Sequence, residues 1–430
     1  MMAIEEEVVA KEEALSISIA STVSEPVRSP SGPYIQMVYY AVAGFFFWAI
    51  LMIQLPYIDQ YFGGPEVVFY VIFAYGLSSN LIRVFLLWNA SNTKKSQARQ
   101  MRDLIILGSG LVAITMLAYP ISMAILGTNP DNDTAGFWVG VTLSAFMGLW
   151  VSLLMNAGFN LMSLAPEKSA SFFLLGQTAT GIVTWPLLIL LLFIATQAGA
   201  EGDNIELYVA IISFGMACVV VAGCIPLYLF KTRYHPVFAN VLVERPDTPS
   251  APRPNTSKAH LKSVFFTIAT PALCAWLCSL ITFSVFPAQI SRWFPQNKGS
   301  YETSIYRSFL VYIFSIADTI GRSSPRFIPA LLKMSNKAMW IFTCCRGLVF
   351  IPLFLMASNI TAPLFSYDWF RLTMIIAFGI SNGSNFSTAN IVGPKRVQVA
   401  DKIHAGTILS LAAINGVFVG TLLGIGLKYI

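Results

Sequence analysis

An aspartate and an arginine lie four residues apart inside an apolar stretch of the chain. Asp318 and Arg322 both fall within residues 305–325, which are long enough to cross a bilayer as a helix. On a helix, this spacing places the two side chains one turn apart on the same face. A single charge in hydrocarbon costs about 2.5–3.5 kcal/mol on insertion scales. The pair must therefore face protein or a water-filled cavity, where it could hold a polar substrate by charged hydrogen bonds.

The same pair has two structural explanations. Asp318 and Arg322 could form a buried ion pair that only fixes helix packing, or a pair at a helix end that reaches the membrane surface. Charges inside membrane spans are nonetheless functional sites by default. We therefore favour a polar anchor for a substrate that crosses the membrane.

The composition of the whole chain indicates a polytopic membrane protein. Of its 430 residues, 56% are hydrophobic and 11% are charged, whereas soluble domains carry about 25% charged residues. The formal net charge is +6. Its basic residues lie between the apolar segments, so they report membrane orientation and do not indicate a nucleic-acid partner. Residues 1–34 are acidic and then rich in Ser and Pro, which predicts a disordered cytoplasmic tail.

Apolar runs of about 20 residues predict eleven transmembrane helices. They are expected at residues 35–58, 66–88, 103–127, 136–160, 171–196, 206–230, 264–287, 305–325, 338–358, 371–392 and 405–428. The fold class expected from this pattern is an all-α polytopic membrane protein.

The one substantial polar segment inside the chain is residues 231–262. Its Pro, Ser and Arg content predicts a flexible cytoplasmic linker. This linker would separate a first bundle of six spans, residues 35–230, from a second bundle of five, residues 263–430. Lys and Arg are concentrated in the linker and in the connections after the second, eighth and tenth spans. This asymmetry predicts a cytoplasmic N-terminus and an extracellular C-terminus, in an integral protein that we expect in the plasma membrane.

Several other spans carry polar side chains on one face. Gln177, Thr180, Gly181 and Thr184 follow a helical spacing, and the span at 371–392 is the most polar of all. Taken singly, such residues usually form contacts between helices that are worth about 0.6 kcal/mol. Taken together, the polar faces of four spans favour a shared hydrated cavity.

Glycine spacing in the last span predicts a close contact with a neighbouring helix. Gly416, Gly420 and Gly424 recur every four residues, so they lie on one side of a helix. Small residues at this spacing let two helix backbones approach closely within a membrane.

No arrangement typical of an enzyme is apparent in the sequence. His235, His260 and His404 fall in connections or at the edge of a span, and the six cysteines lie within apolar segments. No nucleophile elbow or phosphate-binding loop is present. We therefore expect no catalytic residues, no cofactor and no metal site.

Four motifs together resemble the equilibrative nucleoside transporter family. The stretch FSIADTIGRSS at 314–324 resembles the family's Asp-x-x-Gly-Arg motif, and RGLVFIP at 346–352 resembles its Arg followed by an apolar run and Pro. The third match combines SNG at 381–383 with GPKRV at 393–397, and the fourth is the spacing of Pro166, Gly176, Gln177 and Gly181. With the eleven-span layout, the resemblance covers nearly the whole chain.

The resemblance implies a major-facilitator-like fold of six plus five helices that works by alternating access. Its small-molecule substrates would be nucleosides, with nucleobases as a second class, and they would cross the lipid bilayer down their gradient. By position, Asp318 and Arg322 would contact the ribose hydroxyls directly or through water, with Gln177 beside them. The residues expected along the pathway are Gly181, Ser315, Asn382 and Arg346.

Two positions expected to face the base depart from the family's pattern. The family often has Pro-Trp-Asn in its first span, and here Met52 stands at the place of the Trp, with Trp48 one turn earlier. A Gln that reads the base in several members corresponds to Met155, with Asn156 beside it. These four residues and Val417 complete the expected substrate-binding set, and the preference for one base stays open.

Two other functions stay open as alternatives. A proton-coupled carrier of the same fold would use Asp318 as its titrating group, and its uptake would depend on a pH gradient. A membrane receptor that does not transport would bind a ligand without net flux. Polar faces on several spans favour a transport pathway over a receptor.

Overall fold

The protein is described by a computed structural model that covers residues 33–53, 67–90, 96–126, 133–197, 203–243, 257–286, 289–296, 303–359 and 363–427. Within these residues, all regular structure is helical and no strand occurs. The predicted N-terminal tail lies outside them, except for its last two residues.

The described residues contain eleven helices of 20 residues or more, as the sequence predicts. In the first half they are α2 (Tyr34–Ile53), α4 (Val67–Ala90), α5 (Gln97–Leu126), α6 (Asp133–Leu164), α7 (Glu167–Gln197) and α8 (Asp203–Ala222), and the short α9 (Cys224–Phe230) continues α8. In the second half they are α11 (Lys258–Val285), α12 (Thr303–Phe327), α13 (Asn336–Asn359), α14 (Asp368–Lys395) and α15 (Lys402–Leu427). The expectation of an all-α fold with eleven long helices is confirmed.

Two of these long helices are unusually polar. Within the described residues, nine helical stretches are long and apolar enough to cross a membrane, and neither α12 nor α14 is among them. Their polar residues are explained by burial, since Asp318 and Arg322 on α12 are only 2% and 7% exposed. On α14, the run from Asn382 to Pro394 is buried without interruption. Both helices are therefore shielded from lipid on their polar faces.

The linker contains more regular structure than its composition predicts. A short 3₁₀ helix, η2 (Thr232–Tyr234), is followed by α10 (Pro236–Leu242). Proline occupies the first turn of α10, where its missing N–H is not needed. Phe238 is fully buried, and α10 contacts both α5 and α6. The first part of the linker is thus a packed helix, which corrects the expectation of a flexible segment there.

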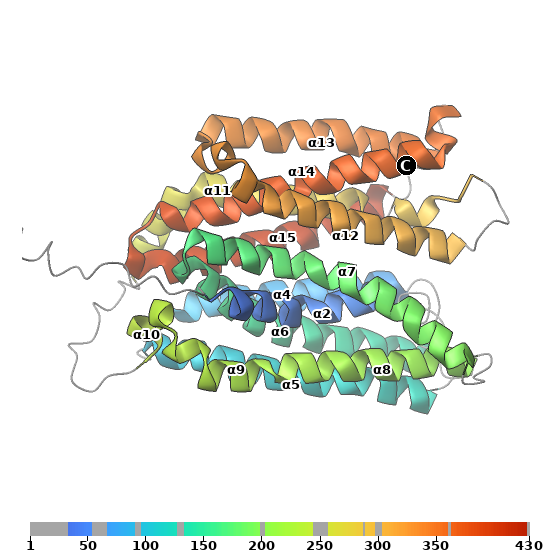
Figure 1. Ribbon diagram of the computed structural model, residues 1–430, viewed down its shortest axis with the longest axis horizontal. Coiled ribbons are helices and arrows are strands. Elements are labelled where there is room, and N and C mark those ends of the chain that lie inside the picture. The colour runs from blue at the N-terminus through green and yellow to red at the C-terminus, as the bar shows by residue number, and fades with distance from the viewer. Residues whose placement is uncertain are drawn as a thin grey trace, which may run out of the picture. The chain divides into compact units, whose positions relative to one another are not determined.

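The helices of each half pack mainly on one another. In Figure 1, α13 runs along one edge of the drawing and α5, α8 and α9 run along the opposite edge. In the first half, α2 packs on α7 and α6 packs on α4 and α5, while in the second half α11 packs on α15 and α12 on α14. The halves meet where α7 contacts α12 and where α15 contacts α4 and α6. That the two halves act as separate bundles stays a prediction.

The glycine seam of the last span is confirmed. A Cβ added at Gly416 would clash with the backbone carbonyl of Trp276 on α11, and one at Gly424 would lie 3.0 Å from the carbonyl oxygen of Phe283. At Gly420, the added Cβ would lie 2.5 Å from the carbonyl oxygen of Leu280. The absence of side chains at these positions therefore lets α15 and α11 approach along most of their length.

Candidate functional site

A cavity of about 260 Å³ lies between the two halves of the chain. It is bordered by α2, α4, α6 and α7 from the first half and by α11, α12, α14 and α15 from the second. Nine of the residues predicted from the sequence line it: Trp48, Met155, Gln177, Gly181, Ser315, Asp318, Arg322, Asn382 and Val417. Segments far apart in the chain thus contribute to one site between the two halves.

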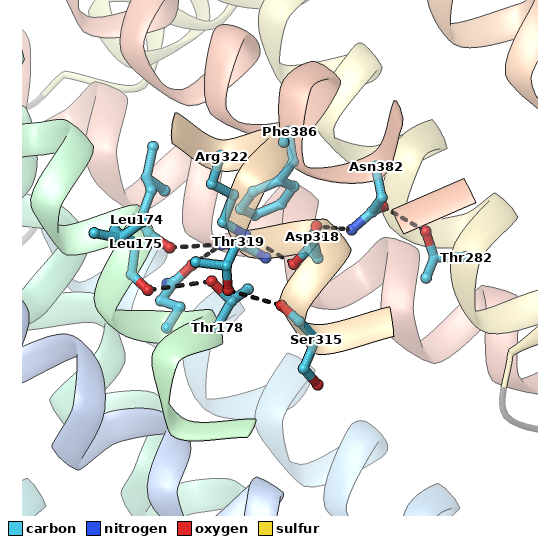
Figure 2. A network of polar contacts seen from close by, with 12 residues as sticks. Leu174, Leu175, Thr178, Thr282, Ser315, Asp318, Thr319, Arg322, Asn382 and Phe386 are labelled. Carbon is cyan, nitrogen blue, oxygen red and sulfur yellow. Dashed lines mark hydrogen bonds and ion pairs between the residues drawn. The ribbon is translucent and has the colours of Figure 1, made fainter. Parts of the chain in front are cut away.

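The predicted pair on α12 forms a buried ion pair in the wall of this cavity. The Nε of Arg322 donates to an Oδ2 of Asp318 at 3.0 Å. The Nη1 of Arg322 reaches across to α7, where it donates to the side-chain oxygen of Gln177 and, at 3.3 Å, to the carbonyl oxygen of Leu174. Figure 2 shows Arg322 between Asp318 on one side and Leu174 on the other. The pair therefore connects the two halves of the protein.

A chain of hydrogen bonds continues from Asp318 into the second half. The side-chain amide of Asn382 donates to Oδ1 of Asp318 at 2.7 Å, and the hydroxyl of Thr282 donates to Oδ1 of Asn382 at 2.6 Å. The Nη2 of Arg346 in turn donates to the hydroxyl of Thr282 at 2.8 Å. Each oxygen of the Asp318 carboxylate thus has a fixed donor. A connected polar network of this kind holds its side chains in one geometry.

Two glycines allow α12 and α14 to cross closely at this network. A Cβ added at Gly321 on α12 would clash with the carbonyl oxygen of Ile380 on α14. One added at Gly383 would clash with the carbonyl oxygen of Asp318 and would lie 2.5 Å from the backbone nitrogen of Arg322. The glycine of the Asp-x-x-Gly-Arg motif therefore has a physical role, because it brings Asn382 within reach of Asp318.

Gly181 makes a similar approach between α7 and α12. A Cβ at Gly181 would lie 2.5 Å from the hydroxyl oxygen and 2.9 Å from the Cβ of Ser315. Both residues line the cavity. The two helices come from different halves, so this contact lies at the interface between the halves.

We expect Gly181→Leu to reduce transport strongly, since a leucine side chain cannot fit against Ser315 without moving α7 from α12. The measurement is uptake of labelled adenosine, normalised to protein at the cell surface. Gly110→Leu is the matched control, because a Cβ at Gly110 meets no atom within 4 Å. Normal uptake and normal surface protein in Gly181→Leu would show that the close approach is not needed.

Aromatic side chains form the apolar part of the cavity. Trp185 on α7 stacks on Tyr312 of α12, with ring centroids 4.8 Å apart. Trp48 on α2 makes an edge contact with Phe283 of α11, with centroids 6.1 Å apart. All four residues line the cavity. Flat rings from both halves can therefore pack on the faces of a planar ligand.

Two predicted site residues do not line the cavity, and a third has a side chain that the structure does not describe. Asn156 is buried next to Met155 but is not part of the wall, and its side-chain oxygen has no partner. Arg346 lies behind the wall, where it supports Thr282. The side chain of Met52 lies outside the described residues. A direct contact of Asn156 or Arg346 with substrate is therefore not supported by their positions here.

Several lining residues were missed by reasoning from the sequence. Arg83 and Tyr75 on α4 line the cavity, as do Thr282 on α11 and Phe386 on α14. A signal existed for Arg83, since it is a charge within the apolar span expected at 66–88. The guanidinium carbon of Arg322 lies 4.8 Å from the centre of the Phe386 ring. Phe386 stands in a run of mostly polar residues, and no sequence pattern there predicts its contact with Arg322.

The two halves are also joined near the ends of α7 and α14 that lie toward the linker. Lys395 on α14 forms an ion pair with Glu167 on α7 at 2.6 Å. The guanidinium of Arg326 lies over the ring of Phe172, 4.2 Å from its centre. The hydroxyl of Thr407 donates to Oδ1 of Asn160 at 3.1 Å. Polar contacts therefore connect the halves at this end of the cavity.

No group of three potential metal ligands occurs within the part of the chain that the structure describes.

Comparison with known proteins gives a family match. The sequence model of a family described as nucleoside transporter matches residues 141–428. Nucleoside transporter 1.2 of Leishmania donovani is 30% identical over 151 residues, which are 34% of this chain and 29% of that protein. Equilibrative nucleoside transporter 1 of Mus musculus is 28% identical over 201 residues, or 43% and 41% of the two chains. The matched part thus spans less than half of these two relatives.

Longer matches exist at lower identity. Equilibrative nucleoside transporter 2 of Mus musculus is 21% identical over 360 residues, 73% of this chain and 76% of that one. Among solved structures, a proton:xylose symporter of the major facilitator superfamily has a TM-score of 0.59 at 10% identity, covering 91% of this chain and 93% of the other. The E. coli fucose:proton symporter has a TM-score of 0.58 at 10% identity, covering 92% and 97%. The structural likeness shows a major-facilitator-like fold.

Proposed function

Because the chain belongs to the nucleoside transporter family, we propose that it is a facilitative carrier that moves nucleosides across a membrane by alternating access. The observation that carries this proposal is the cavity between the halves, with the Asp318–Arg322 ion pair in its wall. Burying a charged pair next to a cavity costs free energy of desolvation. Its presence there therefore favours a role in binding or packing. Its contact with α7 on the opposite half links binding to the movement of the halves.

The bonding capacity left on the ion pair suits two neighbouring hydroxyls. Each oxygen of the Asp318 carboxylate accepts one hydrogen bond within the protein, and a carboxylate oxygen can accept a second. Arg322 uses its Nε and Nη1 within the protein, so its Nη2 can donate to an oxygen. We infer that Asp318 accepts from the ribose hydroxyls and that Arg322 donates to one of them. Each hydrogen bond to a charged group contributes about 1.5–3 kcal/mol of net stabilisation.

The aromatic part of the cavity suits the base. Trp48 and Phe283 present ring surfaces to the cavity, and Met155 adds a polarisable thioether. These apolar groups would hold a planar base by packing more than by hydrogen bonds. A site of this kind tolerates different bases, so we propose that several nucleosides are accepted and that free nucleobases bind more weakly, since they lack the ribose.

Alternating access would require different contacts to break on each side. On the side toward the linker, the Lys395–Glu167 pair and the Thr407–Asn160 hydrogen bond join the halves. On the other side, the stacked rings of Trp185 and Tyr312 join them. We propose that the polar contacts on the linker side break to release substrate toward the linker. The aromatic contacts on the other side stay closed during this step.

The test is uptake of labelled adenosine by cells that express the protein, with unlabelled nucleosides, nucleobases and choline as competitors. We expect nucleosides to compete best and choline not to compete. Uptake should reach equilibrium without accumulation and should not change when the pH gradient is collapsed. Accumulation that depends on the pH gradient would instead support a proton-coupled carrier, and ligand binding without uptake would support a receptor.

We further propose that the protein resides in the plasma membrane with its N-terminus in the cytoplasm. The concentration of Lys and Arg in the linker and in the connections on its side supports this orientation. Ser96, directly before α5, and Thr134, at the start of α6, are both exposed. Because the long helix α5 runs between them, we expect them on opposite sides of the membrane.

A cysteine at Thr134 should react with an impermeant thiol reagent in intact cells, whereas one at Ser96 should react only after permeabilisation. The background would carry serine at the exposed Cys344 and Cys345. Labelling is measured on the protein isolated from the cell surface. Reaction of the Ser96 position in intact cells would reverse the proposed orientation.

A further inference from the structure

The positive and negative charges of the described residues that line the cavity are unequal in number. Among the described residues, the lining set contains two arginines, Arg83 and Arg322, and one acidic residue, Asp318. Asp318 and Arg322 neutralise each other in their ion pair. Arg83 therefore adds one positive charge to the cavity that the ion pair does not compensate.

Arg83 has only neutral partners. It is 4% exposed, and its Nη1 donates to the carbonyl oxygen of Ser410 at 2.6 Å and to the Ser410 hydroxyl at 2.8 Å. Its Nε is buried and has no hydrogen-bond partner. Within the described parts of the chain, no acidic side chain forms an ion pair with it. The guanidinium is thus held by one edge only.

The free edge of this guanidinium has the geometry that anions prefer. Arginine stays protonated in proteins, so Arg83 cannot avoid the free-energy cost of a buried charge by losing a proton. A buried charge without a counter-charge is strongly unfavourable, and two neutral oxygens offset that only in part. The Nε and the remaining Nη nitrogen form a fork that matches two oxygens of a carboxylate or a phosphate.

A second unpaired group in the wall has the same polarity. The amide nitrogen of Gln177 is buried without a partner. It and the Nε of Arg83 are the unpaired buried polar atoms that belong to the described lining residues. Both are donors. These two unpaired atoms therefore offer hydrogens, for which a ligand must supply the acceptors.

We propose that Arg83 is an anion-binding subsite of the cavity, which takes a carboxylate or phosphate group. The anion is either a group on the substrate, as in a nucleoside 5′-carboxylate or monophosphate, or a small free anion that occupies the cavity with a neutral nucleoside. The inference deepens the proposed function and rests on it for the identity of the nucleoside part.

The transport test uses purified protein in liposomes and labelled adenosine uptake. The competitors are adenosine monophosphate, adenosine 5′-carboxylate and, as the matched neutral compound, adenosine 5′-carboxamide. With wild type in a buffer of the large sulfonate MES, the two anions should compete at least about ten-fold better than the carboxamide. In Arg83→Gln, that advantage should disappear, and Arg83→Lys should keep part of it because the charge remains.

A second arm tests a free anion. Chloride or inorganic phosphate is added to the MES buffer, and the concentration of adenosine that gives half-maximal uptake is measured. A free anion at Arg83 should lower that concentration in wild type and leave it unchanged in Arg83→Gln. The control variant is Arg102→Gln, since Arg102 is an exposed arginine outside the cavity, and it should behave as wild type in both arms.

Thermal unfolding of the purified protein separates this proposal from the proposed function. Chloride or phosphate should raise the unfolding temperature of wild type and of Arg102→Gln, but not of Arg83→Gln. Adenosine 5′-carboxylate should raise it more than the carboxamide does in wild type and in Arg102→Gln, and no more than the carboxamide does in Arg83→Gln. If adenosine is not transported and this pattern still appears, the proposed function fails and the anion subsite stands. If carboxylate and carboxamide act alike and no free anion has an effect, Arg83 only ties α4 to α15 and the proposal is wrong.

Discussion

Asp318→Asn should lower the apparent affinity for adenosine about ten- to hundred-fold, since one charged hydrogen bond contributes about 1.5–3 kcal/mol. The asparagine keeps the size of the side chain but removes the charge that Arg322 faces at 3.0 Å. It also replaces one acceptor by a donor, opposite the amide of Asn382. Adenine has no ribose, so its uptake should fall less. The measurement is paired uptake of adenosine and adenine, normalised to surface protein.

A double replacement separates substrate binding from helix packing. If the pair only fixes the packing, Asp318→Leu together with Arg322→Met should be tolerated, because apolar residues of similar size often replace buried ion pairs without loss. If the pair holds the ribose, this double variant should reach the surface and still fail to transport adenosine. Full adenosine transport in the double variant would show that the pair is structural and that the site assignment is wrong.

Gly383→Val should abolish transport and reduce the amount of folded protein. A side chain at this position collides with the backbone of α12 at Asp318 and Arg322. Backbone atoms cannot move aside as the end of a flexible side chain can, so overpacking here should exceed the usual cost of about 1–3 kcal/mol. Separation of α12 from α14 would also break the Asn382–Asp318 hydrogen bond. Uptake and the unfolding temperature in detergent measure the two effects.

The matched control for this variant is Gly215→Val, in the middle of α8. A Cβ at Gly215 meets no atom within 4 Å, so valine there changes helix propensity without changing packing. It should keep most of the uptake and stability of wild type. Comparable losses in both variants would mean that valine harms these helices generally, and that the crossing of α12 and α14 at Gly383 is not special.

Much of the fold could be predicted because a bilayer imposes the length and polarity of its helices. Ten of the eleven long helices begin and end within six residues of the apolar runs, and α8 ends eight residues before its run, where the short α9 continues it. Asp318 and Arg322 were found for the same reason, since charges stand out in an apolar segment. The seam of Gly416, Gly420 and Gly424 follows from helical spacing alone. These features are local in the chain.

The rest depends on contacts between distant segments. Thr282 donates to Asn382, a hundred residues away in the chain. Nothing in the sequence of either span predicts this contact. Met155 and Asn156 were both expected to face the substrate, and of the two only Met155 lines the cavity. The helix α10 forms in a segment rich in Pro and Arg, because burial of Phe238 outweighs its polar composition. Arg83 could have been found, since its charge alone marked it.

The most direct test of the account is adenosine exchange by the purified protein in liposomes. Vesicles loaded with unlabelled adenosine should take up external labelled adenosine transiently above its equilibrium level, as expected for a carrier that exposes one site alternately to each side. This overshoot should be absent in empty vesicles, should persist without a pH gradient, and should be lost in Asp318→Asn. Binding of adenosine without any exchange, or equal exchange by wild type and Asp318→Asn, would contradict the account.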